Sequence, residues 1–248
     1  MIALENINKS FGGLPVIKNL SFTFQRNKKY AIVGPNNCGK STLLYLIAGF
    51  YNYDSGNLIW ADGKTSNINK LSVSQRAHIG IGVSFQDPRA FNDFTVEQNI
   101  YLSLIEFNSD NFFKSGKEKI NLSNHKNKLD ELLFITNLEK YRKLKVSSLS
   151  YGKRKVLDTI CLFARNYKFI MLDEPFAGVD PHEIDTIHKL ILELFKKNVT
   201  LLIVSHEISI IYDIVDEIVL MDEHGNIVLN DTPEEVINSE IFNEIYTL

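Results

Sequence analysis

The apolar residues of this chain recur with two different spacings. Around Leu20 to Phe24 every second residue is apolar, which is the period of a strand with one buried face. From about Thr95 to Arg165 the spacing is helical. Continuous apolar runs, typical of strands buried on both faces, occupy Tyr30–Val33, Ile79–Val83, Phe169–Leu172 and Val199–Val204. The pattern predicts an α/β protein with a helical lobe inserted in its middle.

After the third apolar run, predicted strands and helices alternate. Asp180 followed by Pro181 is a favourable helix start, because Asp caps the free N–H groups and proline fits the first turn. Two short strands are predicted near the end of the chain, over Glu217–Met221 and Ile227–Leu229. The Lys-rich segment Lys114–Lys128 interrupts the helical region and is interpreted as a solvated loop and helix start, not as a nucleic-acid patch.

One loop joins a predicted strand to a predicted helix and carries a phosphate-binding pattern. Its residues are Gly34, Pro35, Asn36, Asn37, Cys38, Gly39, Lys40, Ser41 and Thr42. In that context G-x-x-x-x-G-K-S predicts backbone N–H groups and a helix N-terminus arranged as a concave anion site. Lys40 would reach the β- and γ-phosphates, and Ser41 would offer its hydroxyl to Mg²⁺. The loop alone predicts nucleotide binding and nothing narrower.

Two adjacent acids follow the apolar run at Phe169–Leu172. An acidic residue at the end of such a strand holds Mg²⁺ in phosphate-loop enzymes, which gives this role to Asp173. Glu174 would point to the other side of the strand end, where it can accept a proton from an attacking water. The alternative is a pair of solvated acids at a strand terminus. The upstream phosphate loop favours the metal and base interpretation.

Three further segments narrow the class. Leu149-Ser150-Tyr151-Gly152-Lys153 opens a predicted helix, Phe176–Pro181 follows the two acids, and Val204-Ser205-His206 ends a strand. The whole chain resembles the ABC-type ATPase family. The resemblance lies in the order of four motifs: a phosphate loop, an L-S-x-G helix start, L-D-E-P and a lone histidine after the next strand. The resemblance implies a phosphate-loop (RecA-like) ABC ATPase core, an antiparallel β subdomain and an inserted α-helical subdomain. It implies one domain over 1–248, with the core and β subdomain over 1–94 and 166–248 and the helical subdomain over about 95–165.

The resemblance also assigns residues to ATP. Phe11 matches the aromatic residue that stacks on adenine. Ser150 and Gly152 match signature residues that bind the γ-phosphate of ATP held by the opposite subunit. Asp180 matches the residue that crosses the dimer interface. An active site built this way is completed only by a second copy or a related subunit.

The reacting groups implied by the resemblance are Glu174, Gln86 and His206. Gln86 matches the glutamine that touches Mg²⁺ and the lytic water and senses the partner protein. His206 matches the histidine that contacts the γ-phosphate; a solvated loop histidine is the alternative, and its place after the strand argues against it. The implied cofactors are ATP and Mg²⁺, with Ser41, Gln86 and Asp173 around the metal.

The chain departs from the common family pattern in the phosphate loop and the signature. Asn37 replaces a glycine, and asparagine is the non-glycine residue that best tolerates positive φ. Tyr151 and Lys153 replace a glycine and a glutamine of the signature. Cys38 is expected to lie at the phosphates with its thiolate favoured by the helix N-terminus and Lys40, and therefore to react with thiol reagents unless ATP is bound. Cys161 is expected to be buried and slow.

Composition limits the remaining classes. The chain has 248 residues, 27 Lys and Arg against 30 Asp and Glu, a net charge of −3 and two cysteines. There is no overall basic field to attract nucleic acid, and no disulfide framework. No apolar stretch approaches the ~20 residues that span a bilayer, and the first residues lack the features of a signal peptide. The prediction is a cytoplasmic protein, peripheral on the inner face of the cell membrane.

The expected function is the ATPase subunit of an ABC membrane transporter. Its expected partners are a second ABC ATPase, in a homodimer or heterodimer, transmembrane permease subunits and a substrate-binding protein. The segments Ser10–Leu14, Gly49–Tyr51 and Gly80–Gln86 resemble the branched-chain amino-acid and urea importer ATPases, whereas Phe176–Pro181 also resembles the lipopolysaccharide-export ATPase. A soluble ABC ATPase of iron–sulfur cluster assembly is the third alternative. The transported substrate is not encoded in the residues of this subunit.

Overall fold

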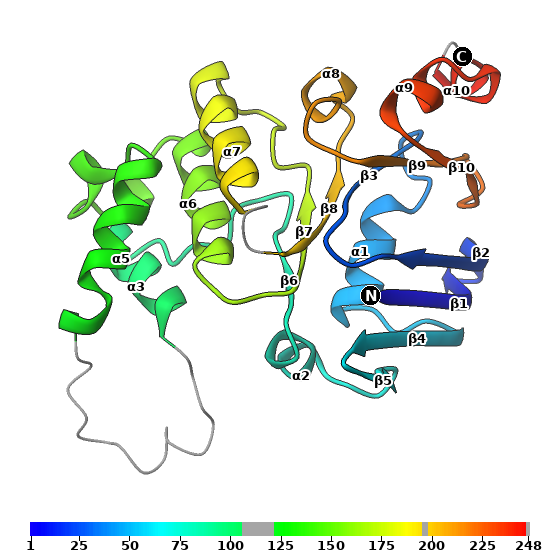
Figure 1. Ribbon diagram of the computed structural model, residues 1–248, viewed down its shortest axis with the longest axis horizontal. Helices are drawn as coiled ribbons and strands as arrows, with labels where there is room; N and C mark the ends of the chain where they lie inside the picture. Colours follow the sequence, from blue (N-terminus) through cyan, green and yellow to red (C-terminus); the bar gives the residue numbers. More distant parts are fainter. Residues whose placement is uncertain (106–121, 195–197, 247–248) are drawn as a thin grey trace. The chain divides into compact units, whose positions relative to one another are not determined.

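The computed structural model describes residues 1–105, 122–194 and 198–246 and resolves into two compact units (Figure 1). Unit 1 comprises residues 1–86, 167–177 and 194–248, and unit 2 comprises 87–166 and 178–193. The helical subdomain expected over about 95–165 falls within unit 2. Unit 2 also takes in 178–193, a helical segment that the sequence analysis had placed in the core.

A six-stranded sheet forms the centre of unit 1. Its strand order is β10-β9-β3-β8-β7-β6, parallel except for β10, which pairs antiparallel with β9. The strands are β3 (Lys29–Val33), β6 (Ile81–Val83), β7 (Phe169–Asp173), β8 (Thr200–Val204), β9 (Glu217–Met221) and β10 (Ile227–Asp231). Every residue of β7 and β8 is buried, as expected of strands covered on both faces. The predicted apolar runs are confirmed as neighbouring strands.

The second sheet of unit 1 is antiparallel, with the order β2-β1-β4-β5. Its strands are β1 (Ile2–Phe11), β2 (Leu14–Phe24), β4 (Ser55–Asp62) and β5 (Lys64–Asn67). Leu20 and Phe24 are buried, whereas Ser21 and Thr23 are exposed, which confirms that the alternating pattern gives this strand one buried face. This sheet is the β subdomain that the resemblance implied.

Helix α1 (Lys40–Ala48) lies between the two sheets of unit 1 (Figure 1). One core cluster contains apolar side chains of both sheets together with Leu43, Leu44, Leu46 and Ile47 of α1. The loop before this helix follows β3, and Ser41 in its first turn contacts Asp173, the last residue of β7, so both lie at the carboxyl ends of these strands. Parallel α/β sheets bind ligands at that edge.

A turn takes the place of the first two residues of the strand predicted over Ile79–Val83, and a short helix precedes that turn. Helix α2 (Val73–His78) begins with a capping box in which Ser72 and Gln75 satisfy each other's backbone N–H groups. Gly80 then turns the chain with φ 107°, and β6 begins only at Ile81. The strand prediction was therefore two residues too long, because Ile79 is the C-cap of the helix and Gly80 forms the turn.

The remaining described helices divide between the units. Unit 1 contains α8 (Ile208–Ile211), α9 (Pro233–Ile237) and α10 (Glu240–Tyr246). Unit 2 contains α3 (Val96–Leu104), α5 (Leu122–Ile135), α6 (Tyr151–Phe163), α7 (Pro181–Leu194) and the 3₁₀ turns η1 (Glu139–Tyr141) and η2 (Val146–Ser148). Helix α7 begins at Pro181, as predicted. The Lys-rich loop proposed over Lys114–Lys128 lies outside the described residues as far as 121, and from Leu122 onward the chain is helical.

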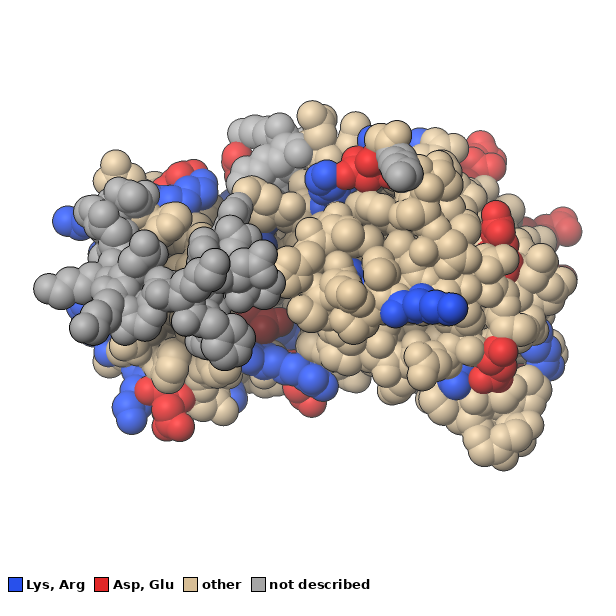
Figure 2. Space-filling model, turned by 90° about the horizontal axis from the view of Figure 1, so that it is seen from below, with Lys and Arg blue, Asp and Glu red and all other residues tan. Residues whose placement is uncertain are grey.

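The surface offers no concentration of one charge on the face drawn in Figure 2, where Lys and Arg side chains are interspersed with Asp and Glu. This fits the net charge of −3 and the absence of an overall basic field. Within the described ranges, no helix is both long enough and apolar enough to cross a bilayer.

Candidate nucleotide site

The loop between β3 and α1 has its backbone arranged for an anion. Gly39 occupies the N-cap position of α1 with φ 105° and supplies no side chain, so the first N–H groups of the helix are left for a ligand. Asn37 has φ 64°, which confirms the expectation that asparagine replaces glycine at a left-handed position. At Gly34 a Cβ would lie 2.4 Å from the carbonyl oxygen of Met221, so the close approach of β9 requires glycine there.

Lys40 is folded back onto its own loop. Its ammonium donates to the carbonyl oxygens of Gly34 at 2.9 Å and Pro35 at 2.6 Å, and the residue is 5% exposed. Burial lowers the pKa of Lys40. Phosphate oxygens entering the loop would therefore meet a desolvated cation that is held by two neutral carbonyls and lies 3.9 Å from the Cys38 sulfur.

Asp173, at the end of β7, is clamped by two hydroxyl groups. Ser41 donates to Oδ1 at 2.9 Å and Tyr45 donates to Oδ2 at 2.7 Å. The backbone N–H of Asp173 also donates to the hydroxyl of Ser84 at 3.3 Å. The carboxylate is 1% exposed, so it stands behind Ser41 and does not face open solvent.

Glu174 and His206 face each other from the ends of β7 and β8. The distance from His206 Nε2 to Glu174 Oε1 is 3.1 Å, and the backbone N–H of His206 lies 3.4 Å from Oε2. Glu174 has φ 47°, and every other described non-glycine residue with positive φ is an asparagine. A glutamate in that region is strained, and such strain concentrates at functional sites. Burial, followed by the charge of Lys40, lowers the pKa of His206, so its ring is neutral near neutral pH.

Lys40, Glu174 and His206 share a cavity of about 690 Å³ in unit 1. Nine of the predicted site residues line it: Asn36, Asn37, Gly39, Lys40, Ser41, Thr42, Gln86, Glu174 and His206. Val16, Ala177 and Glu207 line it too and were missed by the sequence analysis. Five predicted residues of unit 1 are not part of the lining, namely Phe11, Gly34, Pro35, Cys38 and Asp173.

Phe11 lies at the end of β1 in an aromatic group. Its ring is 42% exposed and makes an edge contact with Tyr51 at a centroid distance of 5.3 Å. The ammonium of Lys9 lies 4.8 Å from the ring centroid. An exposed aromatic face in unit 1 is compatible with base stacking, and the adenine role of Phe11 stays a prediction.

The expectation for the Cys38 thiol is wrong. The side chain is 2% exposed and belongs to the core cluster, so only the backbone of Cys38 is presented to the loop. Burial raises the pKa of the thiol, and this effect outweighs the opposing charge of Lys40, whose Nζ lies 3.9 Å from Sγ. Cys161 is half-buried, and burial raises its pKa to about 12.

We therefore expect both thiols of the folded protein to react slowly. The thiolate is the reactive form, and at mildly alkaline pH little of either thiol is ionised. A disulfide reagent should label the native protein much more slowly than the protein in guanidinium chloride, with or without Mg-ATP. Rapid native labelling of Cys38 that ATP prevents would restore the original expectation.

The signature residues lie in unit 2. Ser150 caps α6, accepting a hydrogen bond from the backbone N–H of Lys153 at 3.4 Å. Gly152 is buried, and a Cβ there would lie 3.2 Å from Cγ of Glu183, so the two helix starts touch. Asp180 is exposed just before α7. Their cross-subunit roles stay predictions.

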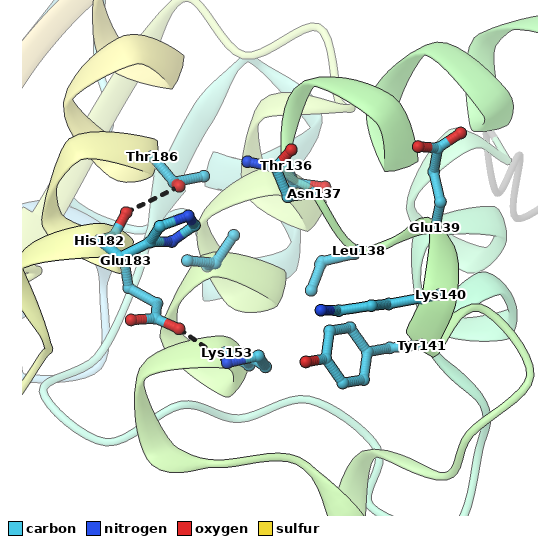
Figure 3. A pocket seen from close by; sticks show the side chains of 11 residues that line it. Thr136, Asn137, Leu138, Glu139, Lys140, Tyr141, Lys153, His182, Glu183 and Thr186 are labelled. Atoms are coloured by element: carbon cyan, nitrogen blue, oxygen red, sulfur yellow. Dashed lines mark hydrogen bonds and ion pairs between the residues drawn. The ribbon is translucent and has the colours of Figure 1, made fainter.

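A second cavity, of about 560 Å³, lies in unit 2 between η1, α6 and α7 (Figure 3). Lys153, which lines it, donates to Oε1 of Glu183 at 2.8 Å, and its Nζ lies 5.4 Å from the ring centroid of Tyr141. The lysine that replaces the signature glutamine is thus neutralised within its own unit. The carboxylate is 8% exposed, and its hydrogen bond with Lys153 lowers the pKa of Glu183.

Lys153→Met should reduce the free energy of unfolding by about 1–2 kcal/mol at neutral pH, because a buried carboxylate loses its partner. A lowered carboxyl pKa gives stability that is present above the ordinary glutamate pKa and is lost as the pH falls through the lowered value. The difference between variant and wild type should therefore shrink in acid. Urea unfolding across this range measures it. Lys128→Met, at the more exposed pair with Glu131, is the control and should have little effect. An equal loss in both variants would contradict the assignment.

The sequence analysis missed three contacts that support the site. The Tyr45 hydroxyl donates to Asp173, and the buried Arg76 of α2 donates to the carbonyl oxygen of Leu46 near the end of α1. The hydroxyl of Tyr246 in α10 accepts a hydrogen bond from the Gly34 N–H at 2.9 Å. Tyr45 follows Ser41 by one helical turn, so its position could have been found from the helical spacing. Tyr246 is far from the loop in sequence, and no local signal points to it.

Comparison with known proteins agrees with this geometry. The family described as "ABC transporter" matches residues 17–177. The lipopolysaccharide export system ATP-binding protein LptB of Haemophilus influenzae is 31% identical over 246 residues, covering 99% of this chain and 96% of the relative. The high-affinity branched-chain amino acid transport ATP-binding protein BraF of Pseudomonas aeruginosa is 27% identical, covering 95% and 93%. A crystal structure of a nucleotide-free ATP-binding cassette from an ABC transporter superposes with a TM-score of 0.82 at 29% identity, covering 99% and 98%.

The family match covers more than half of the chain, and one relative exceeds 30% identity over nearly all of it. The fold has the mixed α/β form with two sheets that the solved cassette shares. The chain is therefore a member of the ABC transporter family of ATP-binding proteins, an ATPase subunit of a transporter.

Proposed function

We propose that the cavity of unit 1 binds Mg-ATP and hydrolyses it with Glu174 as general base, and that this reaction drives a membrane transporter through closure of an ATPase dimer. One observation carries the proposal: Lys40, Ser41, Gln86, Glu174 and His206, from segments far apart in the sequence, line a single cavity. The loop amides and Lys40 bind phosphate oxygens, and Phe11 offers a stacking face to adenine.

The oxygen donors of this cavity fit Mg²⁺. The Ser41 hydroxyl and the Gln86 side chain line it, with the Asp173 carboxylate behind Ser41. No cluster of three or more His, Cys, Asp or Glu within the described ranges could hold a metal by itself. Mg²⁺ is typically held by one or two carboxylates together with substrate phosphates, so this sparse donor set suits it. The ion would neutralise charge on the phosphate oxygens.

The reaction places one proton on this chain. Water attacks the γ-phosphorus, the bond to the ADP oxygen breaks, and the water proton passes to Glu174. Because the ring of His206 is neutral, one nitrogen donates a hydrogen bond while the other accepts one. His206 lies against the Glu174 carboxylate, with Nε2 3.1 Å from Oε1. On ATP binding it would turn toward the γ-phosphate and leave the carboxylate to the water.

Ser150, Gly152 and Asp180 are proposed to complete the site of a second subunit. This can be tested by mixing two inactive variants. Lys40→Ala disables the phosphate loop. Ser150→Asp keeps a good N-cap for α6 but places a negative charge where a partner's γ-phosphate would bind. In a mixed homodimer one site combines the intact loop of one chain with the intact signature of the other.

An equal mixture of the two variants should recover about a quarter of the wild-type sites, since half of the dimers are mixed and each holds one intact site. Steady-state ATP hydrolysis measures the recovery. Each variant mixed with itself is the control and should stay inactive. A mixture as inactive as its components would show that the chain does not form a composite site with itself, which would leave a heterodimer or no shared site.

The type of permease that this subunit serves is proposed from the relatives. LptB is more similar to this chain than BraF, at 31% against 27% identity, so an export-type permease like that of LptB is favoured over the amino-acid importer expected from the sequence motifs. The subunit would bind its permease at the inner face of the cell membrane. Co-purification distinguishes the cases: an export permease alone, an import permease that works with a substrate-binding protein, or the soluble scaffold proteins of iron–sulfur assembly.

A further inference from the structure

Two hydroxyl groups on one face of α1 hold the same carboxylate. Ser41 and Tyr45 are one helical turn apart, and they donate to Oδ1 and Oδ2 of Asp173 at 2.9 and 2.7 Å. Both oxygens of this buried group therefore have a donor, so the carboxylate is fixed in orientation. Asp173 is outside the lining of the cavity, whereas Ser41 is part of it. Asp173 acts on the site through Ser41, because it accepts the hydrogen bond that the Ser41 hydroxyl donates. The lone pairs of the Ser41 oxygen are then left for a cation.

The ring of Tyr45 makes a second connection. It stacks on Phe85 with a centroid distance of 5.5 Å and an interplanar angle of 29°. Phe50 makes edge contacts with both rings, at 6.3 and 5.1 Å. Phe85 immediately precedes Gln86, which lines the cavity, and follows Ser84, whose N–H donates to the carbonyl oxygen of Met171 in β7 at 2.8 Å. The start of the Gln86 segment thus lies between the Asp173 strand and the Tyr45 ring.

We propose that Tyr45 is a positioning residue with two separable parts. Its hydroxyl fixes Asp173 and so orients the Ser41 oxygen toward Mg²⁺, and its ring holds Phe85 and therefore the placement of Gln86. The inference rests on the proposed metal role of Ser41 and Asp173. Tyr45 is not among the residues that line the cavity, so it would act through these neighbours. Hydrogen-bond partners that orient metal ligands typically change metal affinity by 10–100-fold when they are removed.

The hydroxyl is tested by Tyr45→Phe, which keeps the ring. The affinity for a fluorescent ATP analogue that is not hydrolysed is measured once in EDTA and once with Mg²⁺. We expect unchanged affinity in EDTA and about a tenfold smaller gain in affinity on adding Mg²⁺. Tyr53→Phe is the matched control, because the buried Tyr53 hydroxyl has no hydrogen-bond partner among the described residues. A Mg²⁺ gain in Tyr45→Phe equal to that of Tyr53→Phe would overturn the role of the hydroxyl.

The ring is tested by Tyr45→Leu, which removes both parts. Hydrogen exchange at the Phe85 and Gln86 amides should be about tenfold faster than in Tyr45→Phe, because the stacked surface is lost. Phe50→Leu is the control that thins the aromatic cluster without touching Asp173, and it should leave the Mg²⁺ gain intact. Equal exchange in Tyr45→Leu and Tyr45→Phe would overturn the role of the ring. Should Tyr45→Leu not fold, the Tyr45→Phe measurement still decides the hydroxyl.

Ser41→Ala distinguishes a failure of the Tyr45 inference from a failure of the proposed metal role of Ser41. If Ser41→Ala loses the Mg²⁺ gain and Tyr45→Phe keeps it, the metal placement stands and Tyr45 has no part in it. If both variants keep the gain, the proposed metal role of Ser41 fails, and the inference fails with it. Loss of the gain in both variants, with Tyr53→Phe unchanged, supports the two together.

Discussion

Glu174→Gln should bind ATP normally and hydrolyse it about 10²–10⁴ times more slowly than the wild type, the usual cost of losing a general base. Glutamine keeps the size of the side chain and can still hydrogen-bond to His206, but it cannot accept the proton of the attacking water. Because ATP would persist in the closed site, dimers should accumulate with ATP present. Steady-state phosphate release, ATP binding and size-exclusion chromatography measure the three effects.

Glu207→Gln is the matched control for that experiment. It removes the same charge from the same cavity at a residue that has no part in the proposed reaction. We expect only a slight change in kcat, so a large loss in both variants would point to the charge of the cavity and not to a base. Near-normal turnover in Glu174→Gln would remove Glu174 from the mechanism altogether.

The parts of the site that the sequence predicts are those that its local pattern encodes. The phosphate loop is one contiguous motif between a strand and a helix, and Asp173, Glu174 and His206 each follow an apolar run. Parallel strands place their carboxyl ends at one edge, so these motifs had to converge once the strands were recognised. The structure confirms that convergence for Lys40, Glu174 and His206.

The errors come from packing, which local pattern does not encode. Cys38 looked accessible because its neighbours bind phosphate, yet its side chain turns into the core while its backbone stays at the loop. Helix α2 was missed because it has only six residues and is defined by its capping box, not by an apolar stripe. The hydrogen bond from Tyr45 to Asp173 was missed because the two residues are 128 positions apart in the sequence.

Arg76 in α2 is the clearest case of a residue whose importance comes from burial. It is 3% exposed, and its guanidinium donates to the carbonyl oxygens of Leu46 and Ile47, in the last turn of α1, at 2.7 and 2.9 Å. Two further donations reach Leu71 at 3.1 Å and Asn69 at 3.4 Å. Burial lowers the pKa of Arg76, but an arginine stays charged. Placed at the helix C-terminus, this cation also complements the helix dipole.

Arg76→Met should therefore lower the free energy of unfolding by about 3 kcal/mol or more, since several buried carbonyl groups lose their donor at once. Arg76→Lys should recover only part of this, because one ammonium cannot reproduce the planar fork that reaches four carbonyls. Urea unfolding measures both. Arg26→Met is the control: Arg26 pairs with Asp62 through a side chain that is 47% exposed, so its loss should cost at most about 1 kcal/mol. A destabilisation of Arg76→Met no larger than that of Arg26→Met would show that the end of α1 does not depend on this guanidinium.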